Sequence, residues 1–299
     1  MLGAILTAVV TPFTADGIDE GAFRALLRYL VDNGSDGVAV AGTTGEASTL
    51  TDSERLRLIE VAVEEVGDRA SILAGTGSND TAHSVQMSKE AARLGADGVL
   101  IVTPYYNRPP RAGIIGHFRA TATAGLPIVA YNIPGRTGIN MAPDLLAELA
   151  EIPEVIAVKQ ANDDRSALRA IIDEGSLQVY AGNDDLLEPV LRMGGRGVIS
   201  VASHLVGPQM QAMVSAAAVG DLAEVARIDA TLQPLYEALF TTTNPILIKA
   251  ACEMLDLIPD GTPRLPLVPA TRAERAELQS ALGKVGLGGI RQVGATPSA

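Results

Sequence analysis

Residues 155–159 are Val-Ile-Ala-Val-Lys, a short apolar run that ends in a lysine. Similar short runs recur along the chain, bounded by glycine, proline or aspartate. Such runs are typical of strands covered on both faces, as in a parallel sheet. The expected strands are residues 4–10, 37–41, 71–74, 98–102, 127–131, 155–159, 178–181 and 197–201.

Helix-like segments fill the intervals between these runs. Residues 51–54 (TDSE) have the capping-box pattern of a helix start, and Pro143 falls near the first turn of another helix. Eight strands that alternate with helices over about 200 residues favour a closed barrel over an open doubly wound sheet. We therefore predict an α/β fold, a (β/α)8 TIM barrel over residues 1–217.

The strand pattern stops near residue 218. Residues 221–239, 245–257 and 269–282 have the spacing of amphipathic helices, which predicts a C-terminal helical domain over residues 218–283. Residues 284–299 are rich in glycine and small residues, and we expect a loosely held tail there.

The composition excludes several partners. The formal net charge is -12 and no stretch clusters Lys or Arg, so nucleic acid is not an expected partner. No apolar run approaches the ~20 residues that span a bilayer, so we expect no membrane contact. The apolar start lacks a basic leader, and we interpret it as the first strand of a cytoplasmic protein. The histidines are far apart in sequence, which does not favour a metal site.

Polar residues follow many of the expected strands. In a barrel of this kind the carboxyl ends of the strands form the active site. Polar groups at so many neighbouring strand ends are hard to explain by packing, so we predict the active site there. The segments concerned are residues 42–46 (GTTGE), 103–107 (TPYYN), 131–136 (YNIPGR), Lys159 and 182–184 (GND).

Lys159 is the candidate nucleophile. The other lysines, Lys89, Lys249 and Lys284, fall on expected helices or in the tail, where a solvated amine is expected. An amine with a pKa near ~10.4 is protonated at neutral pH, whereas a low dielectric exposes the lone pair that attacks a carbonyl. We interpret Lys159 as the group that attacks a 2-keto acid. A lysine paired with a carboxylate at the rim is the alternative.

The residues expected around Lys159 suit imine chemistry. Tyr131 and Tyr106 can relay protons, and the Thr43 hydroxyl can bridge two phenols. Taken singly, each tyrosine is more often a half-buried packing residue. The GTTG turn offers backbone N–H groups and hydroxyls that could hold a carboxylate, although by itself it is a weak motif that also fits a plain strand-to-helix turn.

Arg136 follows a Pro-Gly turn that would direct its guanidinium toward the mouth of the barrel. A guanidinium fork suits a second carboxylate through paired hydrogen bonds. A salt bridge at the rim is the competing interpretation.

These segments together resemble the pyruvate-dependent aldolase and N-acetylneuraminate lyase superfamily, and most closely its dihydrodipicolinate synthase family. The resemblance runs from residues 6–12 to residues 264–266, nearly the whole chain. Residues 42–46, 102–109, 131–138 and 197–201 carry it, and Asn244-Pro245-Ile246 with Lys249 adds support.

The resemblance implies a Schiff base between Lys159 and pyruvate. From the residues themselves we expect no cofactor and no metal. It implies that Tyr131, Thr43 and Tyr106 form a proton relay, in which Tyr106 reaches into the site of a neighbouring subunit. The family's usual assembly is a homodimer or a homotetramer.

The resemblance also implies substrate contacts. Thr44, with Thr43, would hold the pyruvate carboxylate, and Arg136 would bind the carboxylate of L-aspartate 4-semialdehyde. Gly182 and Ile199 would line the pocket. The product would be 4-hydroxy-tetrahydrodipicolinate, in the first committed step of lysine and diaminopimelate biosynthesis.

Two positions depart from the family pattern. Gln160 stands where members often have an acidic residue. The lysine-feedback site of regulated relatives uses a His and a Glu around positions 55 and 83, where this chain has Arg55 and His83. We therefore predict weak or absent inhibition by L-lysine, although other positions of that site match, namely Ser48, Asn79 and Tyr105.

Two other functions compete with this interpretation. A sister lyase acting on N-acetylneuraminate or a 2-keto-3-deoxy sugar acid would share Lys159 and Tyr131, but a sugar aldehyde has no carboxylate for Arg136. A non-catalytic barrel that binds keto acids would have little need for an inward lysine beside two tyrosines.

Overall fold

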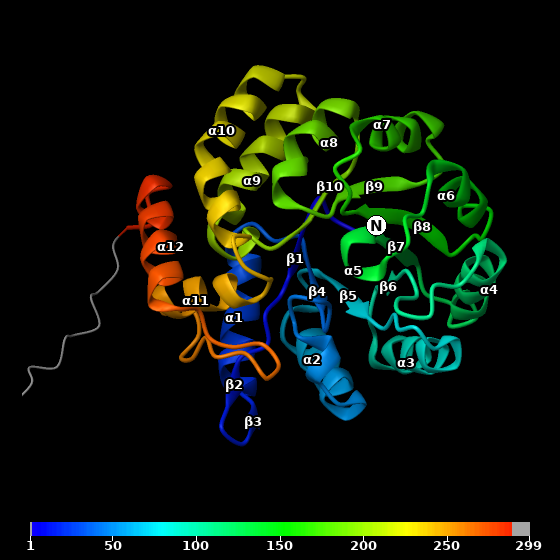
Figure 1. Cartoon of the computed structure of the whole chain (residues 1–299), viewed down its shortest axis with the longest axis horizontal. Helices are drawn as coiled ribbons and strands as arrows, with labels where there is room; N and C mark the ends of the chain where they lie inside the picture. The colour runs from blue at the N-terminus through cyan, green and yellow to red at the C-terminus, as the bar shows by residue number, and fades with distance from the viewer. Residues whose placement is uncertain (1, 289–299) are drawn as a thin grey trace, which may run out of the picture.

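The computed structural model describes residues 2–288, and its centre is a closed barrel of eight parallel strands (Figure 1). Neighbouring strands follow the order β1-β10-β9-β8-β7-β6-β5-β4, which confirms the predicted barrel. A short antiparallel hairpin of β2 (Phe13–Thr14) and β3 (Gly17–Ile18) has no counterpart among the predicted elements. The barrel strands are β1 (Ile5–Ala8), β4 (Gly37–Val40), β5 (Ser71–Gly75), β6 (Gly98–Val102), β7 (Ile128–Asn132), β8 (Val155–Gln160), β9 (Gln178–Ala181) and β10 (Gly197–Ser200).

Helices follow the strands and cover the outside of the barrel (Figure 1). Thr51 caps α2 with the predicted capping box, in which its side chain and that of Glu54 each accept from the other's backbone N–H. Pro143 occupies the first turn of α6, as expected. The helices up to the end of the barrel are α1 (Glu20–Asp32), α2 (Asp52–Val66), α3 (Thr81–Leu94), α4 (Arg111–Ala122), α5 (Pro134–Thr137), α6 (Pro143–Leu149), α7 (Arg165–Glu174), α8 (Leu187–Met193) and α9 (Ser203–Ala218), with 3-10 turns η1 (Ala47–Thr49) and η2 (Asp184–Leu186).

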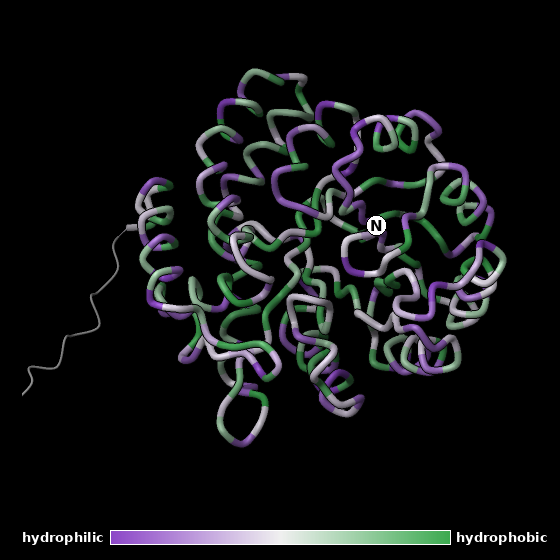
Figure 2. Tube along the Cα trace, in the orientation of Figure 1, coloured by the Kyte–Doolittle hydropathy of each residue, from purple (hydrophilic) through white to green (hydrophobic). Residues whose placement is uncertain are grey.

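The apolar residues of each strand serve two cores. Alternate side chains of a strand point to opposite faces of the sheet, so one set fills the barrel and the other packs under the helices. Leu6, Leu73, Ala157 and Ile199 belong to the inner core. Figure 2 shows apolar strands at the centre and helices of mixed hydropathy around them. Lys159 lies two residues beyond Ala157, and the alternation therefore places it on the inner face.

Three helices form the C-terminal extension, as predicted. They are α10 (Leu222–Leu239), α11 (Ile246–Met254) and α12 (Arg272–Lys284), and they pack on one another and on α8 and α9 (Figure 1). Helix α12 continues to Lys284, so the first residue of the expected tail is helical. Residues 289–299 of that tail lie outside the described residues. Within residues 2–288, no helix has both the length and the apolar character that crossing a membrane requires.

Candidate active site

Lys159 and Tyr131 meet at the carboxyl end of the barrel. They are register partners on the neighbouring strands β8 and β7, and therefore point the same way. The Lys159 Nζ atom lies 4.5 Å from the centroid of the Tyr131 ring. Both side chains are buried, with 5% of Lys159 and 6% of Tyr131 exposed. The strand pattern thus brings the predicted nucleophile and one predicted proton donor into contact.

Burial shifts both groups toward their neutral forms. Desolvation lowers the pKa of Lys159 to about 8, the positive charge of Arg136 acts in the same direction, and the negative charge of Asp184 opposes it. Desolvation raises the pKa of Tyr131 to about 12, whereas the Arg136 charge and the Thr43 hydroxyl pull it down. At neutral pH about one Lys159 amine in ten is unprotonated, compared with about one in three thousand for an ordinary lysine.

Asp184 belongs to the predicted strand-end segment 182–184, but the sequence prediction assigned it no role of its own. Its carboxylate is buried, accepts from the Ser200 hydroxyl at 2.5 Å and from the Ala202 N–H at 2.9 Å, and acts electrostatically on Lys159. Burial raises the pKa of Asp184, and the hydrogen bonds from Ser200 and Ala202 and the Lys159 charge oppose that rise. Its place three residues after the strand 178–181 was the signal for it.

The GTTGE turn lies beside this pair. Thr43 lines the adjoining cavity, and its hydroxyl lies next to the Tyr131 phenol. Thr44 is buried, and its Oγ1 accepts from the Nδ2 of Asn244 at 2.9 Å. A hydroxyl that accepts a bond keeps its own proton to donate. Thr44 can therefore still donate to an anion, as the predicted carboxylate contact requires.

A cavity of about 350 Å³ opens at this end of the barrel, lined by Thr43, Tyr131, Arg136 and Asn244 among others. Arg136 is exposed, and its guanidinium donates to Thr243 Oγ1 at 3.4 Å and to the Asn244 carbonyl at 3.3 Å. Those long bonds to neutral groups leave its charge available to a ligand. Among residues 2–288 no carboxylate forms an ion pair with Arg136. The salt bridge at the rim, which was the competing interpretation, is therefore not present among these residues.

Gly182 and Ile199, like Lys159 and Thr44, are not among the residues that line this cavity. A Cβ at Gly182 would lie 2.6 Å from the Cβ of Ala161, so only glycine allows the end of β9 to approach the end of β8 this closely. Ile199 is fully buried in the inner core, where it packs in the same cluster as Tyr131. The predicted role of both residues in lining the pocket stays a prediction.

Tyr106 lies apart from the other predicted site residues. Its side chain is 91% exposed, and its backbone has a left-handed φ of 69°. It does not line the cavity of its own chain. A role for Tyr106 in proton transfer thus requires a second copy of the chain and stays a prediction.

The expectation of a solvated amine holds for Lys89 and Lys284 and is wrong for Lys249. Lys249 is 0% exposed and forms an ion pair with Glu46 at 2.7 Å. The position of Lys249 on a helix did not reveal its burial or its ion pair, because its acidic partner Glu46 lies far away in sequence. Lys159 has no such partner at ion-pair distance among the described residues.

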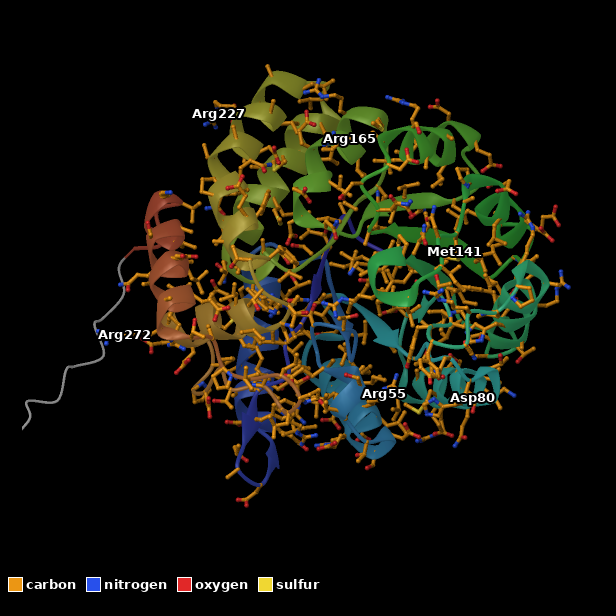
Figure 3. All side chains as sticks on the ribbon, viewed as in Figure 1. Arg55, Asp80, Met141, Arg165, Arg227 and Arg272 are labelled. Atoms are coloured by element: carbon orange, nitrogen blue, oxygen red, sulfur yellow. The ribbon has the colours of Figure 1, made fainter. Side chains whose placement is uncertain are left out.

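The two positions that depart from the family pattern have different surroundings. Gln160 follows Lys159 and so points outward, where its Oε1 accepts from Asn132 at 2.9 Å. Arg55 lies on α2 (Figure 3), lines the far part of the same cavity, and donates to the Gly75 carbonyl at 2.7 Å. His83 contacts Asp52 at 2.9 Å. The described residues contain no group of three or more His, Cys, Asp or Glu placed to hold a metal ion.

The fold and the site define a class of protein, a (β/α)8 barrel in which a buried lysine packs against a tyrosine that lines a cavity. The model of the dihydrodipicolinate synthetase family matches residues 1–285. The chain belongs to this family.

Individual relatives agree with this assignment. The 4-hydroxy-tetrahydrodipicolinate synthase of Moorella thermoacetica is 50% identical over 289 residues, which cover 95% of this chain and 99% of that protein. A crystal structure of dihydrodipicolinate synthase from Cyanidioschyzon merolae with lysine bound has a TM-score of 0.93 at 42% identity, covering 96% of this chain and 99% of that one. The pyruvate complex of the Acinetobacter baumannii enzyme, inhibited by chloride, has a TM-score of 0.93 at 35% identity and covers 96% and 100%.

Proposed function

We propose that this chain has 4-hydroxy-tetrahydrodipicolinate synthase activity, a lyase reaction that joins pyruvate to L-aspartate 4-semialdehyde. The observation that carries the proposal is the buried Lys159 amine beside Tyr131, because burial supplies the neutral amine that imine formation needs. The curated relatives that bear this name support the choice of reaction. The amine itself activates the keto acid, so the proposed reaction uses no cofactor. We place the enzyme in the cytoplasm, as its biosynthetic role implies.

The proposed reaction begins at the pyruvate carbonyl. The Lys159 nitrogen attacks C2 of pyruvate, and the carbinolamine loses its oxygen as water to give an iminium ion. The methyl group then loses a proton, and the resulting enamine forms a C–C bond to the aldehyde carbon of the second substrate. The amino group of that substrate finally displaces Lys159 as the ring closes. Tyr131 and Thr43 are the groups placed to donate and accept the protons of these steps.

Borohydride reduction tests the imine. The protein is reduced with and without pyruvate, and the modified peptide is located by mass spectrometry. We expect one added reduced pyruvate, on Lys159. Lys249 is the internal control, because it is also buried but its amine is held by Glu46. No gain of mass would support a non-catalytic binder of keto acids, and modification elsewhere would contradict the role of Lys159.

A comparison of aldehyde substrates, together with replacement of Arg136, tests the identity of the second substrate. The guanidinium stands at the cavity without a carboxylate partner among the described residues, which suits a substrate that carries one. We expect turnover with L-aspartate 4-semialdehyde and not with N-acetylmannosamine or glyceraldehyde. We expect Arg136→Gln to raise the KM for the semialdehyde by about tenfold or more and to change the KM for pyruvate less. Reaction with only a sugar aldehyde would identify the sister lyase instead.

We further propose that the active form is a homodimer or a larger homo-oligomer in which Tyr106 completes the site of a second copy. The left-handed backbone of Tyr106 and its 91% exposure support this, because such a backbone persists in a non-glycine residue only for a structural or functional reason, and the exposed ring is free to reach a second copy. Complementation tests it: Tyr106→Phe and Lys159→Met subunits are mixed and allowed to exchange. A shared site predicts that about one quarter of the active sites recover. No recovery in exchanged oligomers would contradict the shared site.

A further inference from the structure

A fully buried ion pair joins the C-terminal extension to the GTTGE turn. Lys249 on α11 donates to Glu46 Oε1 at 2.7 Å and to the Thr262 carbonyl at 3.0 Å. Both charged side chains are 0% exposed, and the Lys249 amine also lies 4.4 Å from the centroid of the Phe13 ring. Two charges this deep are tolerated only where geometry and hydrogen bonding are good, so the pair depends on all of these contacts.

The same glutamate ends the turn that carries Thr43 and Thr44. Its Oε2 accepts from the backbone N–H of Arg264 at 2.8 Å, so both carboxylate oxygens are held by the extension. Its backbone is left-handed, with φ 58° and ψ 38°, and its N–H donates to the Thr43 carbonyl at 3.1 Å. A non-glycine residue keeps such a backbone only where its surroundings fix it. The contacts of the side chain supply that constraint.

A second contact reaches the turn from just before the same helix. Asn244 donates to Thr44 Oγ1 at 2.9 Å, and its own carbonyl accepts from Arg136 at 3.3 Å. Helix α11 follows at once, and the N–H of Lys249 donates to the carbonyl of Pro245. One short segment therefore contacts the turn at Thr44 and again at Glu46.

We propose that Asn244, Lys249 and Glu46 form a clamp, by which the C-terminal extension positions the Thr43–Thr44 turn for a carboxylate. This inference rests on the proposed function, which gives the turn its ligand. Asn244 occupies an acceptor site of the Thr44 hydroxyl and so turns its proton toward the ligand. A donor fixed before binding loses less conformational freedom when the ligand arrives. Lys249 and Glu46 are positioning residues, and the extension is part of the active site.

The test compares variants of the clamp with a variant of a second ion pair in the extension, which is partly exposed. Asn244→Ala removes the contact to Thr44, and the double variant E46Q/K249M removes both buried charges with little change in volume. Arg275→Met is the control, because Arg275 pairs with Glu253 at 2.7 Å within the same extension and does not touch the turn. The measurements are the KM for pyruvate, kcat, the Tm, and amide hydrogen exchange of residues 42–47.

We expect Asn244→Ala to raise the KM for pyruvate by about tenfold with little loss of Tm, because it deletes one hydrogen bond at a partly buried site. Exchange of the turn amides should become faster. The double variant should keep most of the Tm, because no uncompensated charge is left buried, and should still show the raised KM and faster exchange. Arg275→Met should change the Tm by at most a few degrees, because a partly exposed ion pair contributes about 0–1 kcal/mol, and should leave both turn measurements at wild-type values.

Two results would overturn the clamp. One is wild-type KM and wild-type turn exchange in both clamp variants. The other is a KM that rises in proportion to the loss of Tm in every variant, including Arg275→Met, because that would be a purely structural effect. Failure of the proposed function is recognised separately, since wild-type protein would then not be trapped on pyruvate. Amide hydrogen exchange needs no substrate. In that case it still shows whether Asn244, Lys249 and Glu46 hold the turn in place.

Discussion

The amine of Lys159 lies 4.5 Å from the centroid of the Tyr131 ring, on the neighbouring strand and in register with it. The ring face favours the ammonium form by about 0.5–2 kcal/mol. Burial opposes it more strongly, because a pKa lowered from 10.5 to about 8 corresponds to about 3 kcal/mol against the charge. Desolvation therefore outweighs the ring contact, and the neutral fraction of the Lys159 amine is larger than that of an ordinary lysine.

Replacing the amine tests its role directly. Lys159→Met keeps most of the side-chain volume and removes the nucleophile, so we expect kcat/KM to fall by about 10³-fold or more and borohydride trapping to disappear. The fold should persist, because a buried ammonium is replaced by an apolar chain. Lys89→Met is the control, since Lys89 is exposed on α3. Substantial activity in Lys159→Met would exclude Schiff-base catalysis at this residue.

The Tyr131 hydroxyl has a matched control on the other side of Lys159. We expect Tyr131→Phe to lower kcat by about 10²-fold or more, because a positioned proton donor contributes that much. Tyr180 is the register partner of Lys159 on β9, but its hydroxyl donates to the Gly3 carbonyl at 2.8 Å. Tyr180→Phe should cost about 1 kcal/mol of unfolding free energy and leave kcat near the wild-type value. Equal kcat values for the two variants would refute the relay.

The pH dependence follows from the amine. Below pH 8 the neutral fraction of Lys159 falls tenfold per pH unit, so kcat/KM for pyruvate should fall with it on the acid side. The negative charge of Asp184 favours the ammonium form and raises that pKa, so Asp184→Asn should move the acid limb to lower pH. Asp185→Asn is the control and should leave the limb in place. A shift to higher pH in Asp184→Asn would contradict the assigned sign.

A binding measurement with L-lysine tests whether the part of the cavity near Arg55 is a lysine-feedback site. Arg55 lines this region with Ser48 and Tyr105, and a guanidinium repels the ammonium groups of L-lysine. We expect calorimetry to detect no binding of L-lysine at physiological concentration, although a relative 42% identical to this chain has been crystallised with lysine bound. The double variant R55H/H83E, which restores the residue types of regulated relatives, should bind it. Binding by the wild-type protein would refute this prediction.

Gly182 is expected to tolerate no side chain. Gly182→Ala would place a Cβ 2.6 Å from that of Ala161 and 2.7 Å from its backbone nitrogen, so we expect a loss of about 1–3 kcal/mol of unfolding free energy. Gly116 on α4 is the control, because a Cβ there meets nothing within 4 Å. Gly116→Ala should stabilise the protein by up to about 1 kcal/mol through helix propensity. Chemical denaturation measures the unfolding free energy of both variants. Equal unfolding free energies for Gly182→Ala and Gly116→Ala would show that the end of the barrel relaxes around the added Cβ, and would contradict this prediction.

The sequence alone determined the barrel and singled out Lys159 as the candidate nucleophile. Short apolar runs between helical segments leave few folds open, and the closed barrel followed from their number. The sequence could predict that Lys159 and Tyr131 lie close together, because each follows an apolar run near the end of its strand and parallel strands bring their carboxyl ends to one edge. The strand bounds agree within a few residues, as for residues 155–159 and β8 (Val155–Gln160).

Only the tertiary structure decided which side chains are buried together across long stretches of chain. Lys249 has the local pattern of a helix-surface lysine, yet it pairs with Glu46 203 residues away. The Asn244 contact to Thr44 and the electrostatic effect of Asp184 on Lys159 likewise depend on distances across the fold. Periodicity reports local geometry and one buried face. It carries no information on which distant partner compensates a buried charge, because that depends on how the extension packs against the barrel.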